Sequence, residues 1–195
     1  MRRLAIGMAA AFVFAVLTLH VLRTDVNPLA RGVSRYAVGE YGYVVNVAFL
    51  LLAAALVATG IGFRDGPQAG RAGVWLLWLG AAGMVAVAIF PARAADSAAM
   101  ANLPHQVGGM VFFVASAAGA VLLSRATTRD TVPAWATAAA VTVYFLSIGV
   151  PALRLAAVRG LLQRVCFAAI VIWVIRANVA LDARAQRRQS ASSTP

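Results

Sequence analysis

The sequence predicts an all-α membrane protein: a six-transmembrane-helix bundle with short loops and both termini in the cytoplasm. The first observation is composition, because hydrophobic residues make up 62% of the 195 residues and charged residues only 12%. The mean hydropathy of +0.83 is far above that of an ordinary soluble domain. The second observation is that the apolar residues fall into six runs, and a transmembrane helix needs about 20 such residues. These six runs leave no room for a separate soluble domain.

The first two apolar runs cover residues 4–22 and 43–63. The first follows Arg2 and Arg3, as the centre of a signal peptide would, but no pair of small residues suitable for cleavage comes after it. We therefore expect it to remain as the first transmembrane helix. The second run ends at residues 64–67, Arg-Asp-Gly-Pro, where Gly and Pro favour a turn.

The next three runs are bounded by prolines. They cover residues 72–90, 104–124 and 133–150. The first of them stops before Pro91, whereas Pro104 and Pro133 stand at the start of the other two. Proline suits a first helical turn because the backbone N–H that it lacks would have no partner there. We expect these runs to form the third, fourth and fifth helices.

The sixth span must contain an arginine. Its longest uncharged stretch, residues 165–175, rises only about 17 Å as a helix, against about 30 Å of hydrocarbon. A helix of sufficient length therefore encloses Arg164, Arg176 or both. Arg176 lies near a polar tail and can extend to lipid headgroups, so Arg164 is expected below the interface. Residues 1–180 are predicted to form one domain, and residues 181–195 a polar, disordered cytoplasmic tail.

Arginine distribution favours cytoplasmic termini. Placing both termini inside leaves ten of the 17 arginines on the cytoplasmic side and seven outside, in agreement with the positive-inside rule. The outer seven are Arg23, Arg31, Arg35, Arg93, Arg154, Arg159 and Arg164.

The charge and the single cysteine exclude several classes of protein. The net charge is +11, but the arginines are spread over both ends of several spans, which is unlike a nucleic-acid-binding face. Cys166 is the only cysteine, so no intramolecular disulfide forms and no Cys/His metal motif is present. We expect Cys166 to be a packed apolar residue. We predict no cofactor and no nucleic acid; membrane lipids are the expected partners, and a homo-oligomer is possible.

Polar residues concentrate in residues 25–46, between the first two spans. With the termini inside, this segment and the ends of later spans are expected to form an outer-face pocket. Its predicted binding residues are Arg31, Arg35, Glu40, Asp96, His105 and Arg164. Arg31 and Arg35 lie one helical turn apart if the loop is helical, and the two guanidinium groups can then hold one anion. Alternatively, Arg35 and Glu40 neutralise one another.

Arg164 has two possible environments. An arginine within the membrane is costly unless it extends to headgroups or finds a partner inside the bundle. We expect Arg164 to face the bundle and to pair with Glu40 or Asp96; the alternative is contact with lipid phosphate. Three tyrosines of the same region, Tyr36, Tyr41 and Tyr43, are interpreted as interfacial anchors.

Three short motifs resemble a known family. They are Ser-Arg-Tyr-Ala-Val-Gly-Glu-Tyr-Gly at residues 34–42, Phe-Pro at 90–91 followed by Pro-His-Gln-Val-Gly at 104–108, and Gly-Leu-Leu-Gln-Arg at 160–164 with Trp173. Together they resemble the domain of unknown function 998 family of bacterial and archaeal membrane proteins. The resemblance implies six helices and a multi-pass protein of the bacterial or archaeal plasma membrane, but no established activity. Relatives often carry an acid two positions after Phe-Pro and Glu-Arg in the last motif, where this chain has Arg93 and Gln163.

Three functions remain open from the sequence. The preferred one is binding of an anionic lipid headgroup or small anion in the outer-face pocket. The alternative is a transporter or permease-like protein, although the deep polar residues of the first five spans carry no charge. The third is a membrane-embedded, metal-dependent hydrolase. No spacing such as HxxxH places two ligands on one helix face, and neither Ser34 nor Ser116 has a GxSxG context.

Overall fold

The computed structural model describes residues 1–64, 70–92, 102–127 and 130–192, and within these ranges all regular secondary structure is helical. The long helices are α1 (Arg2–Leu22), α2 (Gly42–Phe63), α3 (Arg71–Ile89), α4 (Leu103–Thr127), α5 (Val132–Gly149) and α6 (Arg159–Ser192). Three short 3-10 helices are η1 (Val33–Ala37), η4 (Pro151–Leu153) and η5 (Leu155–Val158). All six long helices are long and apolar enough to cross a membrane. The predicted helices are therefore confirmed.

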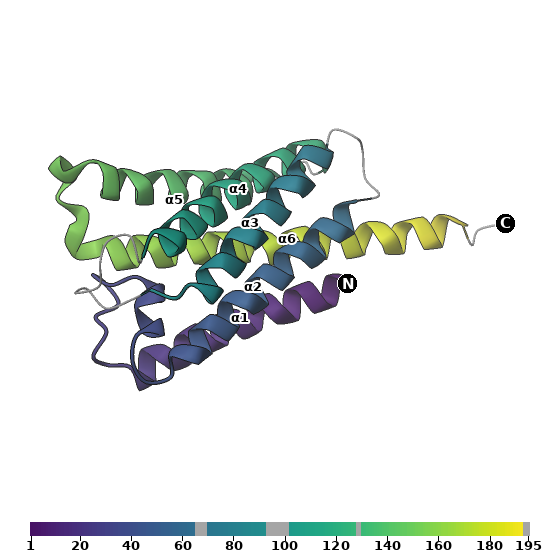
Figure 1. Cartoon of the computed structure of the whole chain (residues 1–195). Helices are drawn as coiled ribbons and strands as arrows, with labels where there is room; N and C mark the ends of the chain where they lie inside the picture. Colours follow the sequence, from purple (N-terminus) through teal and green to yellow (C-terminus); the bar gives the residue numbers. More distant parts are fainter. Residues whose placement is uncertain (65–69, 93–101, 128–129, 193–195) are drawn as a thin grey trace.

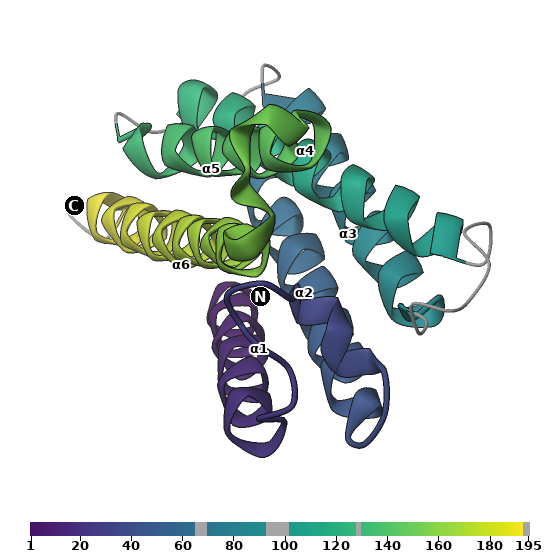
Figure 2. The same ribbon diagram turned by 90° about the vertical axis from the view of Figure 1, so that its left-hand side faces the viewer.

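The start of α1 and the end of α6 lie at one end of the bundle, and the α1–α2 loop lies at the other end together with η4 and η5 (Figure 1). We call these the terminal end and the loop end. Consecutive helices pack on one another, and α6 also packs against α1. Figure 2, seen from the loop end, shows α6 between α1 and α5. The start of α6 thus lies beside the α1–α2 loop.

Glycine lets α3 and α4 approach closely. A Cβ atom on Gly83 would lie 2.6 Å from the carbonyl oxygen of Gly108, and one on Gly108 would lie 2.8 Å from that of Gly83. Gly80 meets the side chain of Ser116 in the same way. This backbone contact is typical of small residues between membrane helices. Gly109 differs, because its nearest neighbour would be a Val87 methyl group 3.9 Å away.

Phenylalanines from four helices fill the centre of the bundle. The ring of Phe167 on α6 lies 5.3 Å from Phe12 of α1, 6.1 Å from Phe49 of α2 and 5.6 Å from Phe112 of α4, between ring centroids. Phe113 lies 5.1 Å from the same ring. Such separations are typical of favourable aromatic contacts. The neighbouring Cys166 is a free, fully buried thiol, as predicted.

Helix α6 is the longest element, with 34 residues, or about 51 Å at 1.5 Å per residue. It encloses both Arg164 and Arg176, as its short uncharged stretch required. It also continues through residues 181–192, where a disordered tail was predicted. These residues include several strong helix formers and no Gly or Pro. An ion pair of 3.2 Å between Arg2 and Asp182 joins this extension to α1.

Candidate functional site

The guanidinium of Arg164 is the centre of the polar contacts at the loop end. Its Nε donates to Nε2 of His20 at 2.8 Å, and its Nη2 donates to the hydroxyl of Tyr36 at 3.3 Å. The Nη1 group lies within hydrogen-bonding distance of three carbonyl oxygens. These belong to Pro28 at 2.7 Å, Arg31 at 2.7 Å and Gly160 at 3.0 Å. An arginine has five N–H donors, and here neutral groups accept most of them. Arg164 therefore joins α6 to α1 and to the α1–α2 loop.

Backbone contacts also hold the α1–α2 loop on α6. The N–H of Leu161 donates to the carbonyl of Leu29 at 2.9 Å. Gly160 permits this approach, because a Cβ atom there would lie 2.4 Å from the carbonyl oxygen of Arg31. Within the loop, the side chain of Asn27 accepts a hydrogen bond from the N–H of Leu29 at 2.9 Å, the pattern of an Asx turn. The loop is thus fixed by its own turn and by α6.

Gln163 makes a second side-chain link. Its Oε1 accepts from the N–H of Val33 at 2.7 Å, and its Nε2 donates to the hydroxyl of Tyr144 at 3.1 Å. The amide therefore bridges η1 and α5. Sequence reasoning noted Gln163 only as a departure from a familial glutamate, and it did not identify Tyr144. Gln163 could have been found because it precedes Arg164 in the last family motif. Nothing in the sequence marked Tyr144.

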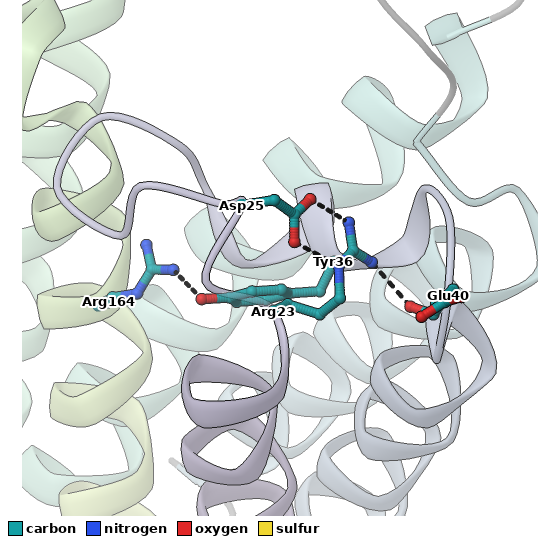
Figure 3. A network of polar contacts seen from close by, with 5 residues as sticks. All are labelled: Arg23, Asp25, Tyr36, Glu40 and Arg164. Carbon is teal, nitrogen blue, oxygen red and sulfur yellow. Dashed lines mark hydrogen bonds and ion pairs between the residues drawn. The ribbon is translucent and has the colours of Figure 1, made fainter.

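An arginine–carboxylate pair closes the other side of the loop (Figure 3). Arg23 contacts Asp25 through two hydrogen bonds, Nε to Oδ1 at 2.7 Å and Nη2 to Oδ2 at 2.8 Å. Its Nη1 also donates to the backbone carbonyl of Glu40 at 2.7 Å. The hydrogen bond between the pair raises the pKa of Arg23 and lowers the pKa of Asp25. Arg23 is largely buried, so this pair stabilises both ends of the loop.

The expected orientation of Arg164 is confirmed, but its expected pairing with Glu40 is wrong. Figure 3 shows the Arg164 guanidinium directed at Tyr36, whereas Glu40 lies beside Arg23. Glu40 is exposed, and it joins the polar network through its carbonyl group. Carbonyl dipoles satisfy the guanidinium in place of a carboxylate. Asp96, the other expected partner, lies outside the described residues.

Tyr36 is a core residue and not an interfacial anchor, which corrects its sequence interpretation. Its side chain is fully buried, and its ring centroid lies 5.4 Å from that of His20. The Arg164 guanidinium carbon lies 5.8 Å from the centre of the same ring, within the range of a cation–π contact. Tyr41 and Tyr43 are exposed, as anchors would be. The Tyr36 ring therefore lines the inner wall of the site.

His20 is held between α1 and α6. Its Nδ1 lies 2.6 Å from the carbonyl oxygen of Val16, while its Nε2 faces the Nε–H of Arg164. Because Arg164 only donates, Nε2 must be the acceptor, which assigns the ring proton to Nδ1. The histidine is then a neutral acceptor that orients the guanidinium.

Arg31 and Arg35 have a different environment from Arg164. Arg31 is exposed and Arg35 is half-buried. Both residues join the hydrogen-bond network of the loop through backbone atoms; within the described part of the chain, neither guanidinium has a hydrogen bond or ion pair. The alternative considered from the sequence, an ion pair between Arg35 and Glu40, is not formed. The loop therefore presents two guanidinium groups with free donors.

His105 does not join this group. It lies at the start of α4, where its Nδ1 is 2.9 Å from the carbonyl oxygen of Phe90 at the end of α3. This contact holds the α3–α4 pair together at the loop end. Among the residues that the structure describes, no three His, Cys, Asp or Glu side chains gather where they would bind a metal ion.

Comparison with known proteins gives one result. Residues 6–180 match the model of a family described as "Protein of unknown function (DUF998)". This is the family that the sequence motifs indicated. Neither the curated proteins nor the solved structures contain a match to the chain.

Proposed function

From the premise that the chain belongs to the DUF998 family of proteins of unknown function, we propose that this integral membrane protein binds a phosphate-bearing anion at its loop end. The guanidinium groups of Arg31 and Arg35 are the proposed ligands. Arg164 is a positioning residue that holds their loop on α6. The observation that carries the proposal is that, within the described residues, the guanidinium groups of Arg31 and Arg35 have no hydrogen bond or ion pair, on a loop that is otherwise fixed by hydrogen bonds.

Charge at the loop end supports an anionic ligand. Within the described residues, six arginines lie there against two acids. The arginines are Arg23, Arg31, Arg35, Arg154, Arg159 and Arg164, and the acids are Asp25 and Glu40. Asp25 is already paired with Arg23. Arginine binds phosphate well because its planar fork donates two parallel hydrogen bonds. The excess charge therefore attracts an anion, and Arg31 and Arg35 offer the donors.

A fixed loop makes binding by Arg31 and Arg35 efficient. An anion that had to order a flexible loop would lose part of its binding energy to conformational entropy. Arg164, Gln163 and the close contact at Gly160 already order this loop. Because its own donors face carbonyls, His20 and Tyr36, Arg164 acts through the loop and not on the ligand.

The core packing disfavours the transporter alternative. A transporter requires a polar path through the bundle, commonly marked by ionisable residues at its midplane. Here Phe167 follows Arg164 by less than one helical turn, and the rings of Phe12, Phe49 and Phe112 surround it. We infer that the polar contacts of the loop end stop at this aromatic layer, which fits a surface-accessible binding site.

Lipid retention by the full chain tests the proposal. The protein is purified in detergent with equimolar phosphatidylglycerol and phosphatidylcholine, and bound lipid is counted by native mass spectrometry. Replacing both Arg31 and Arg35 by Gln should reduce phosphatidylglycerol retention about thirtyfold, since each arginine near a headgroup contributes about 1 kcal/mol. The control is Arg3→Gln with Arg187→Gln, two exposed arginines at the terminal end.

A parallel titration with inorganic phosphate separates a lipid headgroup from a free anion. If phosphate alone raises the melting temperature of the wild type but not of the Arg31/Arg35 variant, a small anion suffices. Equal phosphatidylglycerol retention by the loop variant and the control, together with no response to phosphate, would refute both forms of the proposal.

A further inference from the structure

A long apolar groove runs between α4 and α5, away from the Arg31 loop. Its volume is about 780 Å³, and Met110, Val114 and Leu122 of α4 face Phe145, Leu146 and Val150 of α5 across it. The helices lie side by side on the side of the bundle opposite α1 (Figures 1 and 2). Thr142 is the one hydroxyl residue of the lining, and its side chain bonds to the carbonyl of Ala138 in its own helix at 2.9 Å. The groove thus offers apolar surface and no free polar group.

The groove has the length of one membrane leaflet. Its lining extends from residue 110 to 122 on α4 and from 138 to 150 on α5. Each stretch rises about 18 Å as a helix, whereas half of the hydrocarbon core is about 15 Å thick. The α5 side of the groove reaches the loop end, where a Cβ atom on Gly149 would meet no other atom within 4 Å. A chain entering from the headgroup region at that end would run along the full groove.

Two arginines, Arg154 and Arg159, follow Val150, the last groove-lining residue, along the chain at the loop end. Arg154 follows Val150 by four residues through η4, so the two lie within about 8 Å along the chain. Arg159 reaches back to the last turn of α5, where its Nη2 lies 3.4 Å from the carbonyl of Ser147. The buried Nε of Arg159 has no hydrogen-bond partner in the described part of the protein. Residues 131–181 contain no acid at all, so the chain that follows the groove at this end carries only positive charge.

We propose that this groove binds one acyl chain of an anionic phospholipid, with the headgroup phosphate on Arg154 and Arg159. The apolar lining and the leaflet length match an acyl chain, and the arginines that follow Val150 at the loop end match a headgroup phosphate. The site is separate from the proposed site at Arg31 and Arg35, and either can exist without the other.

Adjacent residues of α5 provide a matched test. Thr142→Phe places a ring in the groove, whereas Val143→Phe places it on a neighbouring exposed position that does not line the groove. The full-length variants are purified with equimolar phosphatidylglycerol and phosphatidylcholine, and bound lipids are counted by native mass spectrometry. Thr142→Phe should lose one bound phospholipid that Val143→Phe retains. Gly149→Leu, which narrows the groove at the loop end, gives the same readout if Thr142→Phe does not fold.

Headgroup preference tests the charged part. Arg154→Gln with Arg159→Gln should lower the phosphatidylglycerol preference of that one lipid by roughly fivefold for each arginine. Arg31→Gln with Arg35→Gln should leave this lipid in place. The groove proposal is overturned if Thr142→Phe and Gly149→Leu retain as much lipid as Val143→Phe. It is equally overturned if the lipid shows no preference for phosphatidylglycerol, or if only the Arg31/Arg35 variant loses it.

Discussion

Replacing Arg164 by Leu should release the α1–α2 loop from α6. Leucine keeps an apolar stem in the helix but removes every donor to the loop and to His20. The carbonyls of Pro28 and Arg31 lie in exposed contacts, so water can replace the lost donor there. The partly buried partners, His20 and Tyr36, have no such replacement. The loop should therefore open locally while the helices remain packed.

The size of the effect follows from the two partly buried contacts. A hydrogen bond from a charged donor contributes about 1.5 kcal/mol or more, so the loop should lose about 3 kcal/mol of local stability. In hydrogen exchange governed by local opening, that corresponds to an increase of about a hundredfold in the exchange rate of the loop amides. Hydrogen–deuterium exchange by mass spectrometry on the full chain in detergent measures it for peptides covering residues 28–37.

Two variants serve as controls for Arg164→Leu. Arg176→Leu removes an exposed arginine from the same helix, whose ion pair with Asp130 should contribute less than about 1 kcal/mol. Glu40→Gln removes a carboxylate that does not contact Arg164. Neither should change exchange in residues 28–37. Loop exchange in Arg164→Leu that equals the controls, or restoration of protection by adding Glu40→Gln, would show that the contacts of Arg164 with His20, Tyr36 and the loop do not hold the loop on α6.

Three further predictions concern packing, pH and topology. Gly160→Ala should lower the free energy of unfolding by about 1–3 kcal/mol, because its Cβ atom would clash with the Arg31 carbonyl oxygen. The control is Gly7→Ala, whose Cβ atom would meet nothing within 4 Å and which should be neutral or stabilising in the same thermal melts. Equal effects of the two substitutions would contradict the close contact at Gly160. The hydrogen bond with Arg23 lowers the pKa of Asp25, so its stabilisation is complete above the ordinary carboxyl pKa of about 4 and is lost as the pH falls through the lowered value. Melting temperatures from pH 6 to pH 3 should fall less steeply for Asp25→Asn than for the wild type, and parallel curves would argue against this pair. A reporter fused after the C-terminus should behave as cytoplasmic; active alkaline phosphatase from that fusion would reverse the proposed orientation.

The helices were predictable from the sequence because hydrocarbon thickness sets both their length and their composition. The short uncharged stretch of α6 likewise required an enclosed arginine, and Arg164 faces the bundle as expected. Residues 181–192 were predicted as a tail from their polar composition, whereas α6 continues through them, as their helix propensity favours.

The partners of Arg164 could not be read from the sequence. A buried positive charge predicts a carboxylate partner, but the acceptors include the backbone carbonyls of Pro28 and Arg31. Because every residue has a backbone carbonyl, the sequence does not mark which ones accept the hydrogen bonds. Their arrangement depends on how the loop folds over Gly160. The burial of Tyr36 follows from the same fold, since a tyrosine near a membrane boundary in sequence can lie either outside or inside a loop.

The most direct measurement is an experimental structure of the full chain in lipid nanodiscs that contain phosphatidylglycerol. The account predicts a lipid phosphate within about 3 Å of guanidinium nitrogens of Arg31 or Arg35, with Arg164 still bonded to the carbonyls of Pro28 and Arg31. A phosphate bound directly by Arg164 in place of those carbonyls, or a loop end with no phosphate beside Arg31 and Arg35, would contradict it.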